Sequence, residues 1–182
     1  MLETKDFEYV RSTVRQVPDF PKPGILFLDV TTIVKDPKAF NLCIDFLYEK
    51  FKDQKIDYIA GIESRGFIFG APLACKLNAG FITIRKPNKL PADTIKETYS
   101  LEYGTDTIEM HADAVKAGDR VVVIDDLLAT GGTAVAACNL VKKAGAKVAA
   151  ATFVIELDPL KGREKIEAKG VEVISMLNYD LD

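Results

Sequence analysis

The stretch that decides the fold runs from Val121 to Thr133 and reads VVVIDDLLATGGT. Its first four residues are β-branched and apolar, which is typical of a buried strand, and two adjacent carboxylates, Asp125 and Asp126, follow them. A loop of small residues comes next. The alanine-rich segment AVAACNLVKKAG then predicts a helix that is closed by Gly145. The pattern therefore predicts a strand, a loop and a helix in direct succession.

The loop between this strand and this helix has the chemistry of an anion site. It consists of Ala129, Thr130, Gly131, Gly132 and Thr133. Backbone N–H groups at the start of a helix favour a negative charge, and the threonine hydroxyls add donors. The lysine of a P-loop and the GxGxxG pattern of dinucleotide folds are both absent. The alternative for the loop alone is a plain tight turn.

The two aspartates would repel a phosphate that touched them. They suit a different part of the same ligand, either hydroxyl groups such as those of a ribose or a bound Mg²⁺. A phosphate cradle beside a diol binder describes a site for a ribose 5-phosphate. The alternative for Asp125 and Asp126 is a strand-end pair, with one carboxylate capping and one solvated.

A second segment repeats this order of elements. The strand DYIAGI is followed by the polar loop ESRGF and by a helix that Gly80 would close. Further apolar strands are predicted at FITIRK, VAAATFVIEL and VEVISML. Apolar strands that alternate with helices indicate an α/β fold, with a central and mainly parallel sheet flanked by helices. Ligands bind such sheets at the carboxyl ends of the strands, where both polar loops lie.

The rest of the chain predicts two special segments within a single domain of residues 1–182. In residues 1–35, Phe7, Val10, Val14 and Val17 share one helical face, prolines then stop the helix, and ILFLDVTTIV reads as extended. Asp36 and Pro37 begin a further helix that ends near Lys52. Residues 87–110 break the alternation and predict a flexible arm that leads into a two-stranded ribbon, the alternative being a disordered insertion.

Composition excludes several classes of protein. The 182 residues carry a formal net charge of −3, so nucleic acid is not an expected partner. No apolar run approaches the ~20 residues that a membrane span needs, and we expect a cytoplasmic protein. Three distant cysteines argue against disulfides or a zinc cluster. His111 is the sole histidine and reads as a surface residue, so acid–base chemistry would fall to Asp, Glu, Lys or Tyr.

These motifs resemble those of a known family. VVVIDDLLATGGT is similar to the 5-phosphoribosyl 1-diphosphate (PRPP) binding motif of the type I phosphoribosyltransferases. Five more segments resemble the adenine phosphoribosyltransferases in order, over nearly the whole chain: PDFPKPGILFLDVT, GIESRGFIFGAPLA, IRKPNKLP, ETYSLEYGTD and LKGREK. The resemblance implies the type I phosphoribosyltransferase fold, in which an N-terminal hood and an arm cover the site.

The resemblance implies a purine salvage enzyme. It would transfer the phosphoribosyl group of PRPP to N9 of adenine, giving AMP and pyrophosphate. Mg²⁺ would be held mainly by PRPP, with possible help from Asp125 and Asp126, and the protein would be a homodimer. These two residues would bind the ribose hydroxyls, and the loop from Ala129 to Thr133 would bind the 5-phosphate.

The family pattern also implies the remaining site residues. Pyrophosphate would be bound by Glu63, Ser64, Arg65, Arg85, Lys86 and Lys89. The Glu63–Ser64 peptide bond would be cis. Glu102 would contact N7 of adenine as a catalytic residue together with Arg65, and Tyr103 would pack on the closed site.

The base-binding segment departs from the family pattern at one position. Adenine would lie along Leu26, Phe27 and Leu28, largely against the backbone. Many relatives carry arginine in place of Leu28, and only a main-chain contact survives that difference. Two alternatives stay open: a PRPP-binding regulator without turnover, and a phosphoribosyltransferase for guanine, xanthine or orotate. The segment before Pro18 is too short for a winged helix that binds DNA, and the chain is acidic, which argues against the first; YSLEYG argues against the second.

Overall fold

The centre of the fold is a parallel β-sheet. The computed structural model describes residues 2–100 and 104–180, and in this part of the chain the sheet has five strands. Their spatial order is β4 (Gly80–Ile84), β3 (Tyr58–Ile62), β7 (Arg120–Leu128), β8 (Lys147–Leu157) and β9 (Val173–Tyr179). All four neighbouring pairs run parallel, which confirms the predicted sheet.

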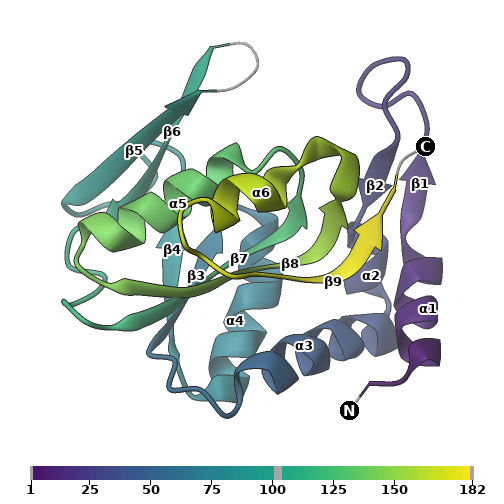
Figure 1. Cartoon of the computed structure of the whole chain (residues 1–182), viewed down its shortest axis with the longest axis horizontal. Coiled ribbons are helices and arrows are strands. Elements are labelled where there is room, and N and C mark those ends of the chain that lie inside the picture. Colours follow the sequence, from purple (N-terminus) through teal and green to yellow (C-terminus); the bar gives the residue numbers. More distant parts are fainter. Residues whose placement is uncertain (1, 101–103, 181–182) are drawn as a thin grey trace.

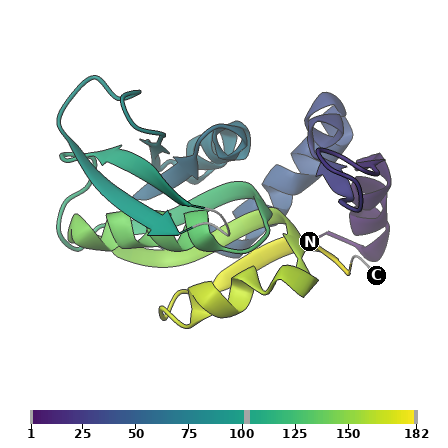
Figure 2. The ribbon, with the colours of Figure 1, turned by 90° about the horizontal axis from the view of Figure 1, so that it is seen from above.

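Helices cover both faces of the sheet (Figures 1 and 2). One face packs against α1 (Thr4–Thr13), α2 (Thr31–Lys35), α3 (Pro37–Phe51) and α4 (Arg65–Leu77). The other face packs against α5 (Gly132–Lys143) and α6 (Gly162–Glu167), which follows the short turn η1 (Asp158–Leu160). A buried parallel sheet needs this cover, because both faces of its strands are apolar.

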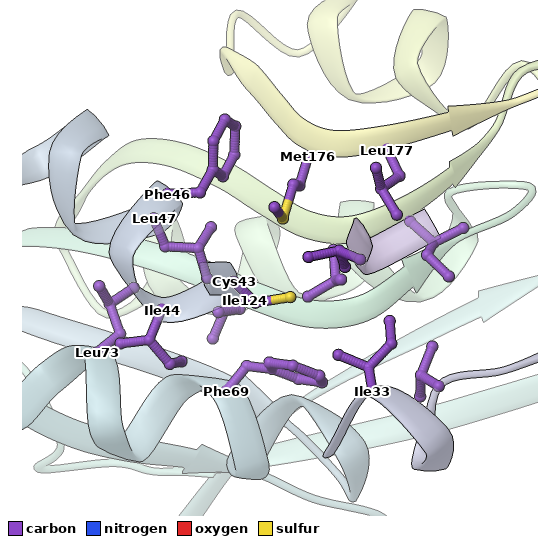
Figure 3. Packing of buried hydrophobic residues seen from close by; sticks show 14 of the residues in the cluster. Ile33, Cys43, Ile44, Phe46, Leu47, Phe69, Leu73, Ile124, Met176 and Leu177 are labelled. Carbon is purple, nitrogen blue, oxygen red and sulfur yellow. The ribbon is translucent and has the colours of Figure 1, made fainter. Parts of the chain in front are cut away.

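Strand β7 shows how one strand serves two cores. Val122 and Ile124 point into the core beneath α3 and α4, whereas Val121 and Val123 point into the core beneath α5. Figure 3 shows the first of these cores, where Ile124 lies among side chains from several helices and strands. Each fully buried aliphatic side chain contributes roughly 1.5–3 kcal/mol. In residues 2–100 and 104–180, no helix combines the length and the apolar character that crossing a bilayer requires.

Two small antiparallel hairpins stand apart from the main sheet. The hood pairs β1 (Arg15–Val17) with β2 (Phe27–Asp29), and the ribbon pairs β5 (Thr94–Ser100) with β6 (Thr105–His111). Figure 1 shows both hairpins on the same side of the molecule, over opposite ends of the sheet. The predicted ribbon is confirmed, and the arm before it begins after β4.

The predicted extended segment ILFLDVTTIV is wrong over most of its length. Only Phe27–Asp29 is a strand, and Thr31–Lys35 forms helix α2. The Asp29 carboxylate accepts hydrogen bonds from the backbone N–H and the hydroxyl of Thr31, at 2.9 and 2.6 Å. This turn directly precedes the helix, and the burial of Ile33 in the core outweighs the β-propensity of the branched residues.

Three predicted boundaries also differ from the structure. Helix α1 ends at Thr13, so Val17 lies in β1 instead of on the predicted helical face. Helix α4 starts at Arg65 and is closed by Asn78 in the left-handed conformation, at φ 53°, whereas Gly80 begins β4. Asparagine tolerates this conformation nearly as glycine does. The helix from Asp36 and Pro37, and the closure after α5 by Gly145, are as predicted.

Candidate active site

The loop after β7 encloses a cavity. Strand β7 continues to Leu128, beyond the predicted end, because it pairs with β8 as far as Glu156. Gly131 then adopts φ 79°, a left-handed conformation that suits glycine, and α5 starts at Gly132. A cavity of about 110 Å³ is lined by Asp125, Leu127, Leu128, Ala129, Thr130, Gly131, Gly132, Thr133, Ala134 and Phe153. The whole loop predicted as an anion site therefore lines one cavity.

The two aspartates at the end of β7 have different surroundings. Asp126 is 3% exposed, and its carboxylate accepts a hydrogen bond from Nε of Arg65 in an ion pair. Asp125 is partly buried and accepts from the backbone N–H of Asp126 at 2.9 Å. Burial and then the neighbouring Asp126 carboxylate raise the pKa of Asp125 well above its ordinary value. The pair is not a capping and a solvated carboxylate.

Helix α4 packs directly on Asp125 through Gly66. A Cβ atom at Gly66 would lie 2.6 Å from the carbonyl oxygen of Ile124 and 3.2 Å from Oδ1 of Asp125. Only glycine allows this approach, and the approach brings Arg65 within reach of Asp126. The peptide bond between Glu63 and Ser64, just before this helix, is cis, as predicted.

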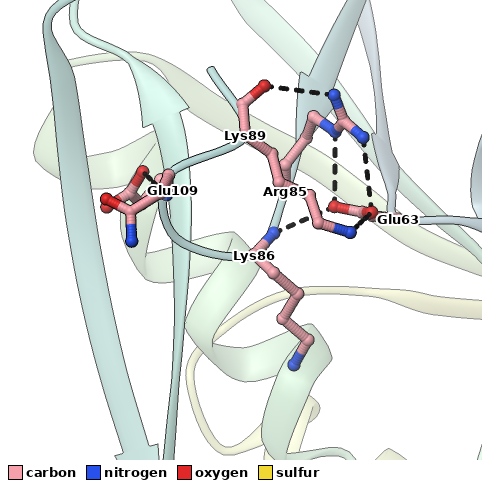
Figure 4. A network of polar contacts seen from close by, with 6 residues as sticks. Glu63, Arg85, Lys86, Lys89 and Glu109 are labelled. Atoms are coloured by element: carbon pink, nitrogen blue, oxygen red, sulfur yellow. Dashed lines mark hydrogen bonds and ion pairs between the residues drawn. The ribbon is translucent and has the colours of Figure 1, made fainter. Parts of the chain in front are cut away.

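The Glu63 carboxylate binds donors from the end of β4 and the arm (Figure 4). It accepts from Lys89 Nζ at 2.6 Å, from the backbone N–H of Lys86 at 3.0 Å, and from Arg85 at 3.3 and 3.4 Å. Burial alone would raise the pKa of Glu63, but these hydrogen bonds outweigh it and lower the pKa to about 2. The Glu63 carboxylate therefore holds Arg85, Lys86 and Lys89 close together at this end of the sheet.

The ribbon contributes residues that the sequence reasoning missed. Lys86 forms an ion pair with Asp106, and its ammonium lies 3.5 Å from the Tyr99 hydroxyl. The Thr133 hydroxyl donates to that same tyrosine oxygen at 3.0 Å. Glu109, which is 4% exposed, accepts from the backbone N–H of Asn88 at 3.3 Å. The alternation of residues in the ribbon was the only signal that could have pointed to Tyr99.

A second cavity lies between the two polar loops. Its volume is about 150 Å³, and it is lined by Ile62, Glu63, Ile84, Arg85, Lys86, Ile108, Asp125 and Thr133. Asp125 and Thr133 line both this cavity and the first one. The small-residue loop and the group of cations are therefore joined through these two side chains.

A third and more apolar cavity lies under the hood. Its volume is about 360 Å³, and it is lined by Val17, Phe20, Phe27, Asp29, Val30, Thr31 and Arg65. Phe20 and Phe27 meet edge to face, with ring centroids 5.1 Å apart. Leu28 is 3% exposed and, like Leu26, packs in the core instead of lining this cavity. The side chain of Leu28 therefore points into the core and away from this cavity.

Two predicted residues, Glu102 and Tyr103, lie outside the described residues. Ser64 is exposed between Glu63 and Arg65. His111 ends β6 and is partly buried, so it is not the free surface residue that the sequence suggested. In the described part of the chain, no group of three or more His, Cys, Asp or Glu residues could hold a metal ion.

Comparison with known proteins identifies the family. The model of the phosphoribosyl transferase domain matches residues 29–180. An adenine phosphoribosyltransferase of Koribacter versatilis is 55% identical over 171 residues, which are 94% of this chain and 93% of the relative. The chain belongs to the adenine phosphoribosyltransferase family. The family match includes both polar loops and the ribbon, while Leu26, Phe27 and Leu28 lie before its first residue.

Solved structures of adenine phosphoribosyltransferases have the same fold as this phosphoribosyltransferase over nearly its whole length. The adenine phosphoribosyltransferase of Rhodothermus marinus is 48% identical, with a TM-score of 0.92 over 97% of this chain and 100% of that one. The enzyme of Saccharomyces cerevisiae is 42% identical, with a TM-score of 0.89 over 96% of this chain and 100% of that one. The yeast enzyme was solved with adenine and D-2,5-dideoxy-2,5-imino-altritol 1,6-bisphosphate.

Proposed function

We propose that the protein transfers the 5-phosphoribosyl group of PRPP to N9 of adenine, giving AMP and pyrophosphate. The observation that carries this proposal is the position of Asp125, which lines both the small-residue cavity and the cavity beside the cations. PRPP has a phosphate at one end of its ribose and a pyrophosphate at the other. A carboxylate between two anion sites matches the diol that lies between those groups.

The 5-phosphate occupies the cavity of the loop from Ala129 to Thr133 in this proposal. Among the residues that the structure describes, no lysine or arginine lines that cavity, so backbone N–H groups and the two threonine hydroxyls supply the donors. Thr133 already donates to Tyr99, and a phosphate oxygen would take over that hydrogen bond. The loop then recognises the phosphate by its shape more than by net charge.

The ribose hydroxyls bind the carboxylates of Asp125 and Asp126. As the bond to pyrophosphate breaks, the anomeric carbon gains positive charge, and the nearby carboxylates stabilise that charge. Arg65 holds Asp126 in place from the neighbouring loop. The ion pair orients the carboxylate toward the site.

Pyrophosphate leaves toward the second cavity, whose charged side chains are those of Glu63, Arg85, Lys86 and Asp125. Lys86 pairs with Asp106, and Lys89 and Arg85 pair with Glu63. The protein carboxylates keep these cations oriented before the ligand arrives. Pyrophosphate therefore competes with these carboxylates for the cations. Glu63 positions the cationic side chains, and pyrophosphate contacts these side chains and the backbone of the loop.

Mg²⁺ accompanies PRPP in this proposal. Two adjacent carboxylates, Asp125 and Asp126, follow the buried part of β7, and carboxylate oxygens are ligands that Mg²⁺ prefers. Asp125 and Asp126 are the residues that would help to hold the ion. When bound, Mg²⁺ supplies positive charge that offsets the charge of the pyrophosphate group.

Adenine enters the cavity under the hood. The rings of Phe20 and Phe27 give it an apolar surface, and the backbone at Phe27 reads its polar edge. The buried side chain of Leu28 is compatible with such a main-chain contact. Glu102 handles the proton of the imidazole part of the base, since a carboxylate can do so near neutral pH.

A pyrophosphate-release assay tests the proposal. The protein is mixed with PRPP, Mg²⁺ and either adenine, guanine, hypoxanthine, xanthine or orotate. We expect turnover with adenine and at most a few per cent of that rate with the other bases. Turnover with another base only would assign a different specificity. PRPP binding without any turnover would favour a regulator.

A further inference from the structure

The segment LKGREK, which begins at Leu160, has no role in the site described above. It follows β8 and forms the end of η1 and the start of α6. Gly162 in this segment is buried and lies against the small-residue loop. A Cβ atom at Gly162 would lie 2.3 Å from the carbonyl oxygen of Ala129 and 3.0 Å from the backbone nitrogen of Gly131.

The contact is reciprocal and involves main chain on both sides. A Cβ atom at Gly131 would lie 2.7 Å from the carbonyl oxygen of Gly162. Gly131 needs its left-handed φ, but Gly162 is not among the residues with a positive φ. Glycine is therefore required at position 162 for space alone. The two backbones touch directly, so a shift of one moves the other.

Arg163 fixes the position of Gly162. Its guanidinium donates two hydrogen bonds to the Glu156 carboxylate, at 2.9 and 2.5 Å, and a third to the carbonyl oxygen of Val173 at 2.7 Å. Glu156 is 3% exposed and lies opposite Leu128 in the sheet. The two hydrogen bonds between Arg163 and Glu156 therefore connect the start of α6 to β8, next to the point where β7 leads into the loop.

We propose that Gly162 and Arg163 are positioning residues for phosphate binding. Neither residue lines the cavity, so they act through the loop from Ala129 to Gly131, which they support from behind. A loop of alanine, threonine and glycine has no large side chain to maintain its shape, and its backbone must be held from outside. The inference rests on the proposed function, since it assumes that the loop binds the 5-phosphate of PRPP.

The test uses Arg163→Lys, which keeps the positive charge and removes the two-point geometry. Calorimetry measures the binding of ribose 5-phosphate and, separately, of pyrophosphate with Mg²⁺. We expect the Kd for ribose 5-phosphate to rise about tenfold, because a loop that is held less firmly presents its N–H groups less accurately to the phosphate. The Kd for pyrophosphate and the KM for adenine should change less than about twofold, because their contacts lie on other loops.

The matched control is Arg11→Lys. Arg11 also donates to a backbone carbonyl of β9, that of Asn178 at 2.8 Å, but it lies on α1. The control should leave all three constants unchanged. If Arg163→Lys weakens the binding of ribose 5-phosphate and of pyrophosphate equally, the variant is generally destabilised and the inference is overturned. An unchanged Kd for ribose 5-phosphate would also overturn it.

Gly162→Ala provides a second and independent variant. The added methyl group must displace the backbone of the loop, so we expect the KM for PRPP to rise more than in Arg163→Lys while the KM for adenine stays within about twofold. An unchanged KM for PRPP in the folded variant would contradict the inference. If the wild-type protein converts adenine to AMP and both variants bind ribose 5-phosphate as tightly as the wild type does, only this inference is disproved. Wild-type protein without turnover would disprove the proposed function as well.

Discussion

Two strand–loop–helix units, β3 to α4 and β7 to α5, face each other across the site and differ in how they hold charge. The loop after β3 is charged, with Glu63 and Arg65 on either side of a cis peptide bond. The loop after β7 is uncharged and consists of small residues. The two strands are neighbours in the sheet and pair in parallel, so both loops emerge at the same edge.

In the proposed function, the two units recognise anions in two different ways. The β7 unit depends on backbone shape, with Gly131 held in a left-handed conformation against Gly162. The β3 unit depends on side-chain ion pairs, in which Arg65 binds Asp126 and Glu63 binds Arg85 and Lys89. Replacing side chains should therefore affect the β3 unit, whereas changing the backbone should affect the β7 unit.

The largest effect is expected at the carboxylates that both units share. Replacing Asp125 and Asp126 together with asparagine should weaken PRPP binding by about a thousandfold, since two hydrogen bonds to charged groups are lost. Calorimetry with PRPP and Mg²⁺ measures this change. Asp113→Asn, on an exposed turn, is the control. Undiminished affinity in the double variant would refute the sugar contacts.

The backbone of the β7 loop is tested next. Gly131→Ala should raise the Kd for ribose 5-phosphate by about a hundredfold, because alanine disfavours φ 79° and its Cβ meets the Gly162 carbonyl. Thr130→Ala, which shortens one exposed side chain, should raise the same Kd by only about threefold. If the threonine variant loses as much as the glycine variant, the loop does not act through its backbone.

The side chains of the β3 loop should show the opposite selectivity. Arg65→Lys should weaken pyrophosphate binding by about tenfold, because lysine lacks the planar fork that suits phosphate oxygens. Ribose 5-phosphate binding should change less than about threefold, because lysine can keep an ion pair with Asp126. Arg15→Lys, in the ion pair between exposed Arg15 and partly buried Asp29, is the matched control. A larger loss for ribose 5-phosphate than for pyrophosphate would reverse the assignment of the two loops.

The smallest effect concerns stability and its dependence on pH. The pKa of Glu63 is lowered from 4.5 to about 2 in the folded protein, so its contribution is complete above pH 4.5 and is lost as the pH falls toward 2. Glu63→Gln should lower the free energy of unfolding by about 1 kcal/mol at neutral pH. Denaturant titrations should show this difference vanish under acid, with exposed Glu8→Gln as the control. A difference that persists at pH 2 would rule out this role.

Local patterns predicted the sheet, the helices of both units and the two polar loops, because these follow from short-range periodicity and from glycine and proline positions. They failed at α2, where the burial of Ile33 outweighed the propensity of its branched neighbours. They also missed the hydrogen bond between Tyr99 and Thr133, which joins residues 34 positions apart. Contacts of this kind depend on how elements pack, which no local pattern encodes.

A crystal structure with AMP tests the central claim most directly. The account predicts that the phosphate lies in the loop from Ala129 to Thr133, that the ribose hydroxyls contact Asp125 and Asp126, and that the base lies against Phe27. A phosphate bound instead by Arg65, Arg85 or Lys86, with the small-residue loop free of ligand, would contradict it.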